Sequence, residues 1–223
     1  MHDEMPIESI ISNARVVLAG DVILASVVLR NGLIAEIGSP SAKSGEDFGG
    51  DYLLPGLVEL HTDHLESHYK PRPRVRWSPI AALQAHDAQV AASGITTVFD
   101  ALRVGLDEEA DMGQADMMAL GTAIGDASAA GRLRAEHFIH LRCEVSAPDC
   151  LDGFRMLQEH PRVKLASLMD HAPGQRQFAS LDAYKVYYQG KLRMSDEALA
   201  RFSERRNLES ETFSAPHRNA ISQ

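Results

Sequence analysis

The sequence is short of cysteine, short of basic residues relative to acidic ones, and free of long apolar runs. Its two cysteines, Cys143 and Cys150, are too few for a disulfide framework. Its 22 Lys and Arg residues are outnumbered by 31 Asp and Glu, and the net charge of -9 argues against nonspecific nucleic-acid binding. Asn13, Arg15 and Asp21 interrupt the best apolar stretch, so we expect no membrane insertion.

The first residues, Met1–Glu4, are acidic and do not resemble a signal peptide. Together with the low cysteine content, this predicts a protein of the reducing cytoplasm. The chain of 223 residues is 44% hydrophobic, which is enough for a sizeable buried core.

Residues 7–38 alternate as short strands. The Asn31-Gly32 pair between two apolar runs predicts a hairpin with a type I′ turn. A second ribbon is expected around Gly20, and residues 39–51 form a polar connector. By itself this pattern indicates only a small β element.

The most informative stretch is an apolar run over residues 53–60 that ends in metal-type ligands. These are His61, Asp63, His64, Glu66 and His68. A buried strand that carries polar groups to its carboxyl end is where α/β barrels place their chemistry. Two residues apart on a strand, His61 and Asp63 point to the same side, and their imidazole and carboxylate suit zinc, manganese or iron. A solvated loop is the alternative, and ligation by His64 or His68 stays open.

Alternating helices and strands follow this segment. Ser78-Pro79 predicts a helix start, with Gly94 just after its end. Residues 95–100 are β-branched and apolar, so strand, helix and strand form a βαβ unit. Further strands are expected near 137 and 163, with helices over 106–131, 149–159, 181–188, 195–206 and from 209 onward. Asp100 and Arg103, at the end of the second strand, are either contacts of a site or plain loop residues.

The third strand carries ionisable residues on one side. Alternation over residues 137–145 places His140, Arg142 and Glu144 on one face and apolar residues on the other. Buried charges need partners, which a metal site supplies, although a salt-bridged barrel lining would do so too. The fourth strand ends at Asp170-His171, and a histidine at the end of a barrel strand indicates a metal ligand.

A cationic loop lies between the first strand and the first long helix. Alternating prolines keep Lys70, Arg72, Arg74 and Arg76 on an extended segment. Arg forks match phosphate oxygens, so the loop is a candidate clamp for an anionic substrate. A solvated surface loop is equally compatible with this pattern.

The segment from Pro55 to Asp63 resembles the first barrel strand of the amidohydrolase superfamily, in which His-x-His is usual and His-x-Asp stands here. With the following Leu-Glu-x-His and Pro-Arg-Pro, it resembles one branch, the M family of phosphonate metabolism. The resemblance runs from about residue 7 to the end of the chain, and its motifs are long and specific.

The resemblance implies an α/β fold, in which a β-sandwich element and connector (residues 1–51) precede a partial TIM-like (β/α)8 barrel (residues 52–223). It also implies one or two divalent metal ions. Glu144 stands at the place of a bridging carboxylate, and His171 belongs to an Asp-His-Ala-Pro-Gly-Gln motif that follows the strand donating a metal-binding histidine. The implied metal ligands are His61, Asp63, Glu144 and His171, and the implied substrate-binding residues are Arg72, Arg74, Arg76, Arg142 and Arg176.

The implied reaction is the hydrolysis of alpha-D-ribose 1-methylphosphonate 5-triphosphate to the 5-phosphate and pyrophosphate, in the carbon–phosphorus lyase pathway. The partner is then a small phosphorylated ribose phosphonate, with a homo-oligomer left open. Alternatives are an amidohydrolase that acts on a C–N bond, and an inactive remnant or partner-binding piece.

The sequence offers four convincing barrel strands, whereas an eight-unit barrel needs about 250 residues. The family's later metal histidine and its general-base aspartate have no counterpart here. We therefore expect a truncated chain, with the general base beyond residue 223, and for this chain alone weak metal binding and no turnover. A complete smaller α/β domain is the alternative.

Overall fold

The computed structural model describes residues 8–39, 45–105, 112–173 and 195–223. The chain divides into two compact units, Met1–Gly56 and Leu57–Gln223. The sequence placed a division at residues 51 and 52. The assignment of the first unit to a sandwich and of the second to a barrel remains a prediction.

The first unit is a five-stranded sheet. Its strands are β1 (Glu8–Val17), β2 (Val22–Arg30), β3 (Leu33–Gly38), β4 (Glu46–Asp47) and β5 (Tyr52–Leu53). The order is β3-β2-β1-β4, with β5 also paired to β1. Both predicted ribbons are present as antiparallel pairs. Asn31 and Gly32 have φ values of 50° and 77°, the left-handed conformation that the predicted type I′ turn requires.

The second unit is built on a parallel sheet of four strands, β6 (Leu57–Thr62), β7 (Ile95–Val104), β8 (Glu136–Glu144) and β9 (Val163–Met169). They lie in the order β6-β7-β8-β9, and every neighbouring pair is parallel. The strands expected near 55, 95, 137 and 163 are therefore confirmed, as is the α/β class. Parallel strands bring their carboxyl ends to one edge of the sheet, so the predicted ligands share that edge.

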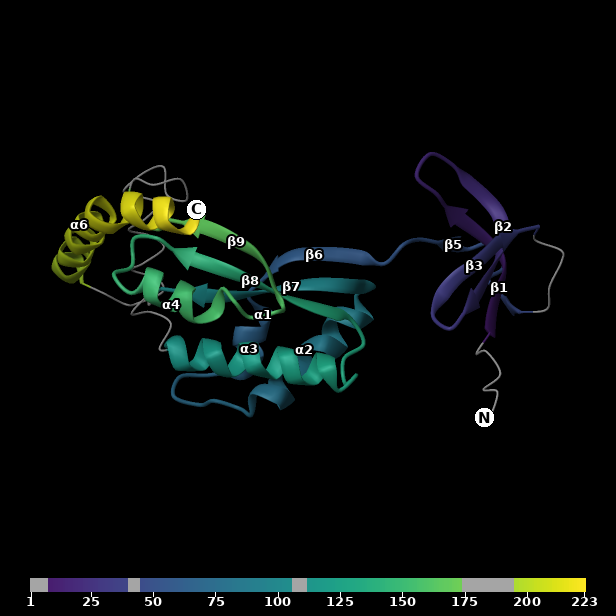
Figure 1. Ribbon diagram of the computed structural model, residues 1–223, viewed down its shortest axis with the longest axis horizontal. Coiled ribbons are helices and arrows are strands. Elements are labelled where there is room, and N and C mark those ends of the chain that lie inside the picture. Colours follow the sequence, from purple (N-terminus) through teal and green to yellow (C-terminus); the bar gives the residue numbers. More distant parts are fainter. Residues whose placement is uncertain (1–7, 40–44, 106–111, 174–194) are drawn as a thin grey trace. The chain divides into compact units, whose positions relative to one another are not determined.

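The helices are α1 (His64–Tyr69), α2 (Pro79–Ala92), α3 (Gln114–Ala129), α4 (Cys150–Leu157) and α6 (Asp196–Ile221). Helices α2 and α3 cover one face of the sheet (Figure 1). The helix α2 begins as predicted, and Gly94 has a φ of 76° after its end. Residues 106–111 of one expected helix, and all of the helix expected over 181–188, lie outside the described residues. The two helical segments expected after residue 195 form a single helix, α6, which contains Pro216.

The predicted alternation in β8 is confirmed. Ile139, Leu141 and Cys143 are fully buried in the core with side chains of α3, such as Leu120. The intervening His140, Arg142 and Glu144 therefore lie on the opposite face, away from α3. The sheet thus has an apolar face under its helices and a second face that carries ionisable groups.

Gly105 follows the last residue of β7 and has a φ of 95°. A Cβ at this position would lie 2.9 Å from the Cβ of Ala147 and 3.0 Å from the carbonyl oxygen of Glu144. Glycine therefore lets the end of β7 pass close to the turn after β8, because any side chain would strain the backbone and push that turn away.

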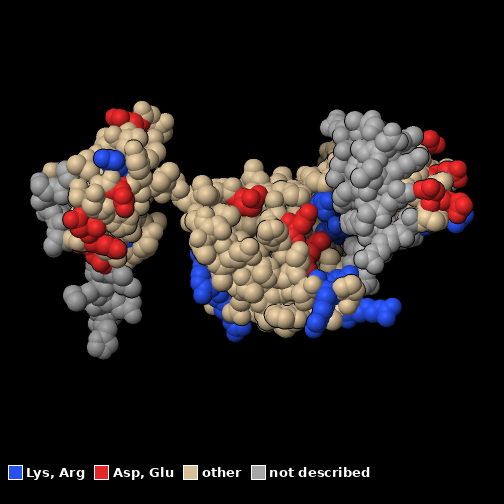
Figure 2. All heavy atoms as spheres, turned by 180° about the vertical axis from the view of Figure 1, so that it is seen from behind, with Lys and Arg blue, Asp and Glu red and all other residues tan. Residues whose placement is uncertain are grey.

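The charges of the chain are distributed over both units. In the view of Figure 2, acidic and basic side chains occur in small interspersed groups. Among the described residues, no helix is both long and apolar enough to cross a membrane.

Candidate functional site

Two of the predicted ligands lie at the carboxyl end of β6. His61 is the penultimate residue of the strand, whereas Asp63 is the N-cap of α1. Their side chains meet all the same, with 3.8 Å between Nε2 of His61 and Oδ1 of Asp63. Both are partly exposed, at 36% and 44% of the side chain, so this pair lies within reach of solvent.

The other two predicted ligands contact each other at the ends of β8 and β9. The Glu144 carboxylate accepts a hydrogen bond from the backbone N–H of His171 at 3.0 Å and contacts Nδ1 of the same residue. It also accepts from the hydroxyl of Ser146 at 2.6 Å and from the guanidinium of Arg206 on α6 at 3.1 Å. Burial alone would raise the pKa of Glu144, but the interactions with His171 and Ser146 outweigh it and lower the pKa to about 2.

Arg142 lies between the two pairs. Its Nη1 is 3.5 Å from Oδ1 of Asp63, and its Nε donates to the sulfur of Met169. Within the described part of the chain, Oδ1 of Asp63 and Nη1 of Arg142 are buried atoms that have no hydrogen-bond partner. A buried carboxylate oxygen that has only long ion-pair contacts and no hydrogen-bond donor fits a cation ligand, because burying such an oxygen is costly.

His140 lies between these two pairs, on the face of the sheet that carries the ionisable groups. Its Nδ1–H donates to the carbonyl oxygen of Leu60 at 3.0 Å, so Nε2 accepts from the hydroxyl of Ser167 at 2.8 Å. Its ring lies 4.9 Å from that of His61 in an edge-on arrangement. Burial is the main cause that lowers the pKa of His140. A neutral imidazole therefore joins β6, β8 and β9 below the two pairs.

Helix α6 contributes to the site through residues that sequence reasoning missed. Besides Arg206, the hydroxyls of Ser210 and Ser214 donate to Asp170 at 2.7 and 2.6 Å, and Nδ1–H of His217 donates to the carbonyl oxygen of Val145. These α6 residues recur at intervals of four, four and three, which places them on one side of the helix. That polar stripe is the signal in the sequence that could have marked α6 as a neighbour of the site.

The predicted phosphate clamp is only partly described. The guanidinium of Arg76 binds both oxygens of Asp116, at 2.7 and 3.0 Å, and is the main cause that lowers the pKa of Asp116 to about 2. Arg72 pairs with Val75 in a short bridge, and Arg74 adopts a φ of 64°. Arg176 lies outside the described residues. Arg76 thus fastens its loop to α3, and substrate binding by these arginines stays a prediction.

The neighbours of His61 and Asp63 on α1 have other contacts. Nε2 of His68 pairs with the side chain of Gln89 on α2 at 3.0 Å, and the backbone N–H of His64 donates to Thr62. Glu66 is buried and accepts from the backbone N–H of Arg103 at 3.2 Å. Burial is the main cause that raises the pKa of Glu66.

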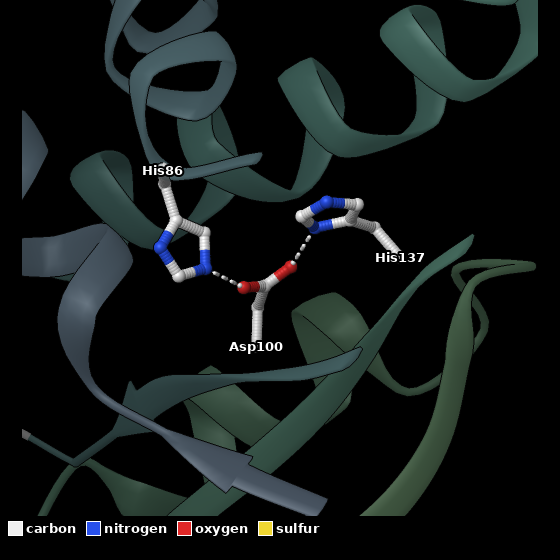
Figure 3. Close-up of side chains that lie close together, drawn as sticks. All are labelled: His86, Asp100 and His137. Carbon is white, nitrogen blue, oxygen red and sulfur yellow. Dashed lines mark hydrogen bonds and ion pairs between the residues drawn. The ribbon is translucent and has the colours of Figure 1, made fainter. Parts of the chain in front are cut away.

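Asp100, for which the sequence left the role open, belongs to a separate cluster (Figure 3). His86 of α2 and His137 of β8 both approach its carboxylate, at 2.8 and 2.7 Å. Among the described residues, these three are the one group of His, Cys, Asp or Glu side chains close enough to hold a metal ion, with all donor atoms within 4.8 Å of one another. The four ligands predicted from the sequence do not form such a group there.

Comparisons with known proteins agree with the motif around His61. This chain is similar to alpha-D-ribose 1-methylphosphonate 5-triphosphate diphosphatase of Escherichia coli. The two are 41% identical over 217 residues, which is 95% of this chain and 57% of the diphosphatase. The chain therefore spans little more than half the length of this relative. The predicted resemblance to the diphosphatase is confirmed.

A dihydroorotase of Thermococcus kodakarensis is 32% identical over 93 residues, or 41% of this chain and 21% of that protein. No family model matches the chain. Similar solved structures include N-acetyl-D-glucosamine-6-phosphate deacetylase from Mycobacterium smegmatis (13% identity, 71% of this chain and 42% of that one, TM-score 0.47). L-hydantoinase from Arthrobacter aurescens is another (19% identity, 82% of this chain and 38% of that one, TM-score 0.45).

Proposed function

We propose that this chain belongs to a metal-dependent hydrolase that cuts the phosphoanhydride of alpha-D-ribose 1-methylphosphonate 5-triphosphate and releases pyrophosphate. The observation that carries the proposal is the 41% identity over 217 residues to the diphosphatase that bears this substrate in its name. The same 217 residues include every predicted ligand strand of the chain. A cytoplasmic location and a small-molecule partner are parts of the same proposal.

In this proposal His61, Asp63, Glu144 and His171 hold one or two divalent ions, which are zinc, manganese or iron. A divalent ion held there would lower the pKa of a coordinated water and so make hydroxide available at neutral pH. Two observations support the assignment. Oδ1 of Asp63 has no hydrogen-bond partner among the described residues, and the low pKa of Glu144 keeps that carboxylate available as an anion.

The residues around the ligands have positioning roles. Ser146 and Arg206 fix the orientation of the Glu144 carboxylate through hydrogen bonds of 2.6 and 3.1 Å. Arg142 stands 3.5 Å from Asp63 and its Nη1 has no hydrogen-bond partner among the described residues, so in this proposal its guanidinium binds a phosphate oxygen of the substrate. Arg72, Arg74, Arg76 and Arg176 complete the proposed neutralisation of the triphosphate.

The test uses the protein as its own cell makes it. Its intact mass is measured first, and pyrophosphate release from the triphosphate substrate is then followed with zinc, manganese or iron present. We expect metal-dependent release that is lost in His61→Asn and in His171→Asn. The matched control is His160→Asn, because His160 lies before β9, at the opposite end of the sheet from the ligands.

Each other outcome has a defined meaning. Ring opening of dihydroorotate or a hydantoin without pyrophosphate release would contradict the proposal and favour an enzyme of C–N bonds, for which the 93-residue similarity to a dihydroorotase is the specific observation. A mass near 24.4 kDa without any turnover would instead favour an inactive remnant.

A further inference from the structure

The cluster of His86, Asp100 and His137 lies on the opposite face of the sheet from the proposed active site. Side chains alternate between the two faces of a strand. Asp100 of β7 and His137 of β8 lie on the same side as Val98 and Ile139 of the buried core, opposite to the face that carries His140, Arg142 and Glu144. Their exposed side-chain fractions are 0%, and that of His86 is 1%. The sheet separates this closed cluster from the partly exposed pair His61 and Asp63.

We propose that His86, Asp100 and His137 form a second, structural site for a divalent metal ion of the zinc type. Imidazole nitrogens and carboxylate oxygens are donors that zinc-type ions take in proteins, and these three residues would fill three of the four positions of a tetrahedral ion. The three side chains come from three elements, α2, β7 and β8, and point toward one another in Figure 3. Their donor atoms all lie within 4.8 Å of one another, close enough to surround a single ion.

The surroundings of His137 match those of a metal-binding histidine. Such a residue turns its other ring nitrogen to a carboxylate, which fixes the ring. Here Nε2 of His137 faces Oδ1 of Asp87 at 3.3 Å, while Nδ1 faces Asp100. Asp87 is itself held by the backbone N–H groups of Arg134 and Ala135, at 2.9 and 3.0 Å. The chain therefore keeps a second buried carboxylate whose geometry orients the ring.

Complete burial decides the kind of metal site. A catalytic ion keeps an open position for water or substrate, whereas a structural ion is enclosed by protein. The cluster lies under α2 with no exposed donor atom, so the ion would join α2 to β7 and β8 without meeting a substrate. Binding of the ion to the folded chain alone would stabilise this layer of the fold.

The experiment removes the other site and leaves the cluster untouched. The double variant His61→Asn/His171→Asn is stripped with a chelator, loaded with zinc and passed through gel filtration. We expect about one zinc ion per chain to remain, and cadmium NMR of the same variant to report nitrogen and oxygen ligands. Absence of retained zinc would overturn the proposal and leave a hydrogen-bond network held together by a proton on His137.

Two further variants locate the retained ion. His86→Asn added to the double variant removes one proposed ligand, and we expect the zinc to be lost. His68→Asn is the matched control, because the His68 ring lies 5.7 Å from that of His86 but has its own partner in Gln89, and we expect the zinc to stay. Zinc that survives His86→Asn would place the ion elsewhere and contradict the proposal. None of these readouts depends on pyrophosphate release, so the proposed function can fail independently.

Discussion

The two faces of the parallel sheet differ in the exposure and the hydrogen bonding of their ionisable side chains. On the helix-covered face, Asp100 has hydrogen bonds to two histidines and no exposed area. On the other face, Asp63 is 44% exposed as a side chain and has an oxygen without a hydrogen-bond partner in the described part of the chain. The enclosed carboxylate holds α2, β7 and β8 together, through hydrogen bonds or through the proposed structural ion, whereas the one at the open edge can also reach a ligand from solvent.

The strongest test of this contrast compares the two aspartates directly. Asp100→Ala should lower the free energy of unfolding by about 3–5 kcal/mol, because it removes the buried carboxylate that pairs with His86 and with Nδ1 of His137. Asp63→Ala, at the exposed edge, should change it by about 1 kcal/mol or less. Urea unfolding followed by circular dichroism measures both. Equal losses would mean that the two faces do not differ as described.

Glu144 allows a second test of this contrast, because it belongs to the open edge and yet is buried. Its pKa is lowered from 4.5 to about 2 in the folded chain, so its contribution to stability is complete above pH 4.5 and is lost as the pH falls toward 2. The shift corresponds to about 3 kcal/mol. Unfolding titrations over this range should show the loss, and Glu144→Gln should remove it.

The control for that titration is Glu204→Gln, because Glu204 is an exposed residue of the same α6 that supplies Arg206. We expect it to follow the acid titration of the unaltered chain. If Glu144→Gln loses stability with the same acid profile, another carboxylate is responsible for the transition.

For the helix-covered face we expect stability to depend on pH in the opposite direction. Burial would lower the pKa of His137, but hydrogen bonds and charges from Asp100 and Asp87 outweigh it and raise the pKa above 6.5. In the metal-free chain this stabilisation is therefore complete below pH 6.5 and is lost as the pH rises through the raised pKa. Unfolding measured from pH 6 upward should show the decline. His137→Asn should be less stable at pH 6 and should lack that slope.

The smallest expected change in stability concerns the cationic loop that carries Arg74 and Arg76. Arg76→Gln should cost about 1 kcal/mol, because it breaks a two-point ion pair with Asp116 that is partly exposed. Arg74→Gln, in the same loop, should change stability by about 0.5 kcal/mol or less. Chemical unfolding separates the two. A larger loss for Arg74→Gln would show that the loop is held elsewhere.

Local patterns predicted much of this structure. Ile95 to Asp100 and His137 to Val145 are β-branched or alternating segments, and each became a strand whose faces follow from the period of two. The Asn31-Gly32 turn followed from the φ values that a two-residue hairpin requires. These features depend on neighbours in the chain, which a sequence displays directly.

The parts that sequence reasoning missed depend on distant neighbours. Nothing in the sequence around His86 distinguishes it from other residues of a helix. Its place in the cluster is visible only once the fold brings Asp100 and His137 from two strands next to it. Arg206 is 62 residues from Glu144, and the local sequence of α6 does not indicate which residue Arg206 contacts. Pairings across such separations are set by how the elements pack, so a single sequence leaves them open.

The contacts of α6 also set an order of events in time. The ribosome delivers the chain from its amino end, so the four parallel strands are complete before Arg206 is synthesised. Until then Glu144 and Asp170 await the donors that Arg206, Ser210 and Ser214 provide. The edge that carries the proposed chemistry therefore gains the α6 donors only after the four strands have been synthesised, and until then Glu144 has only the local donors Ser146 and His171.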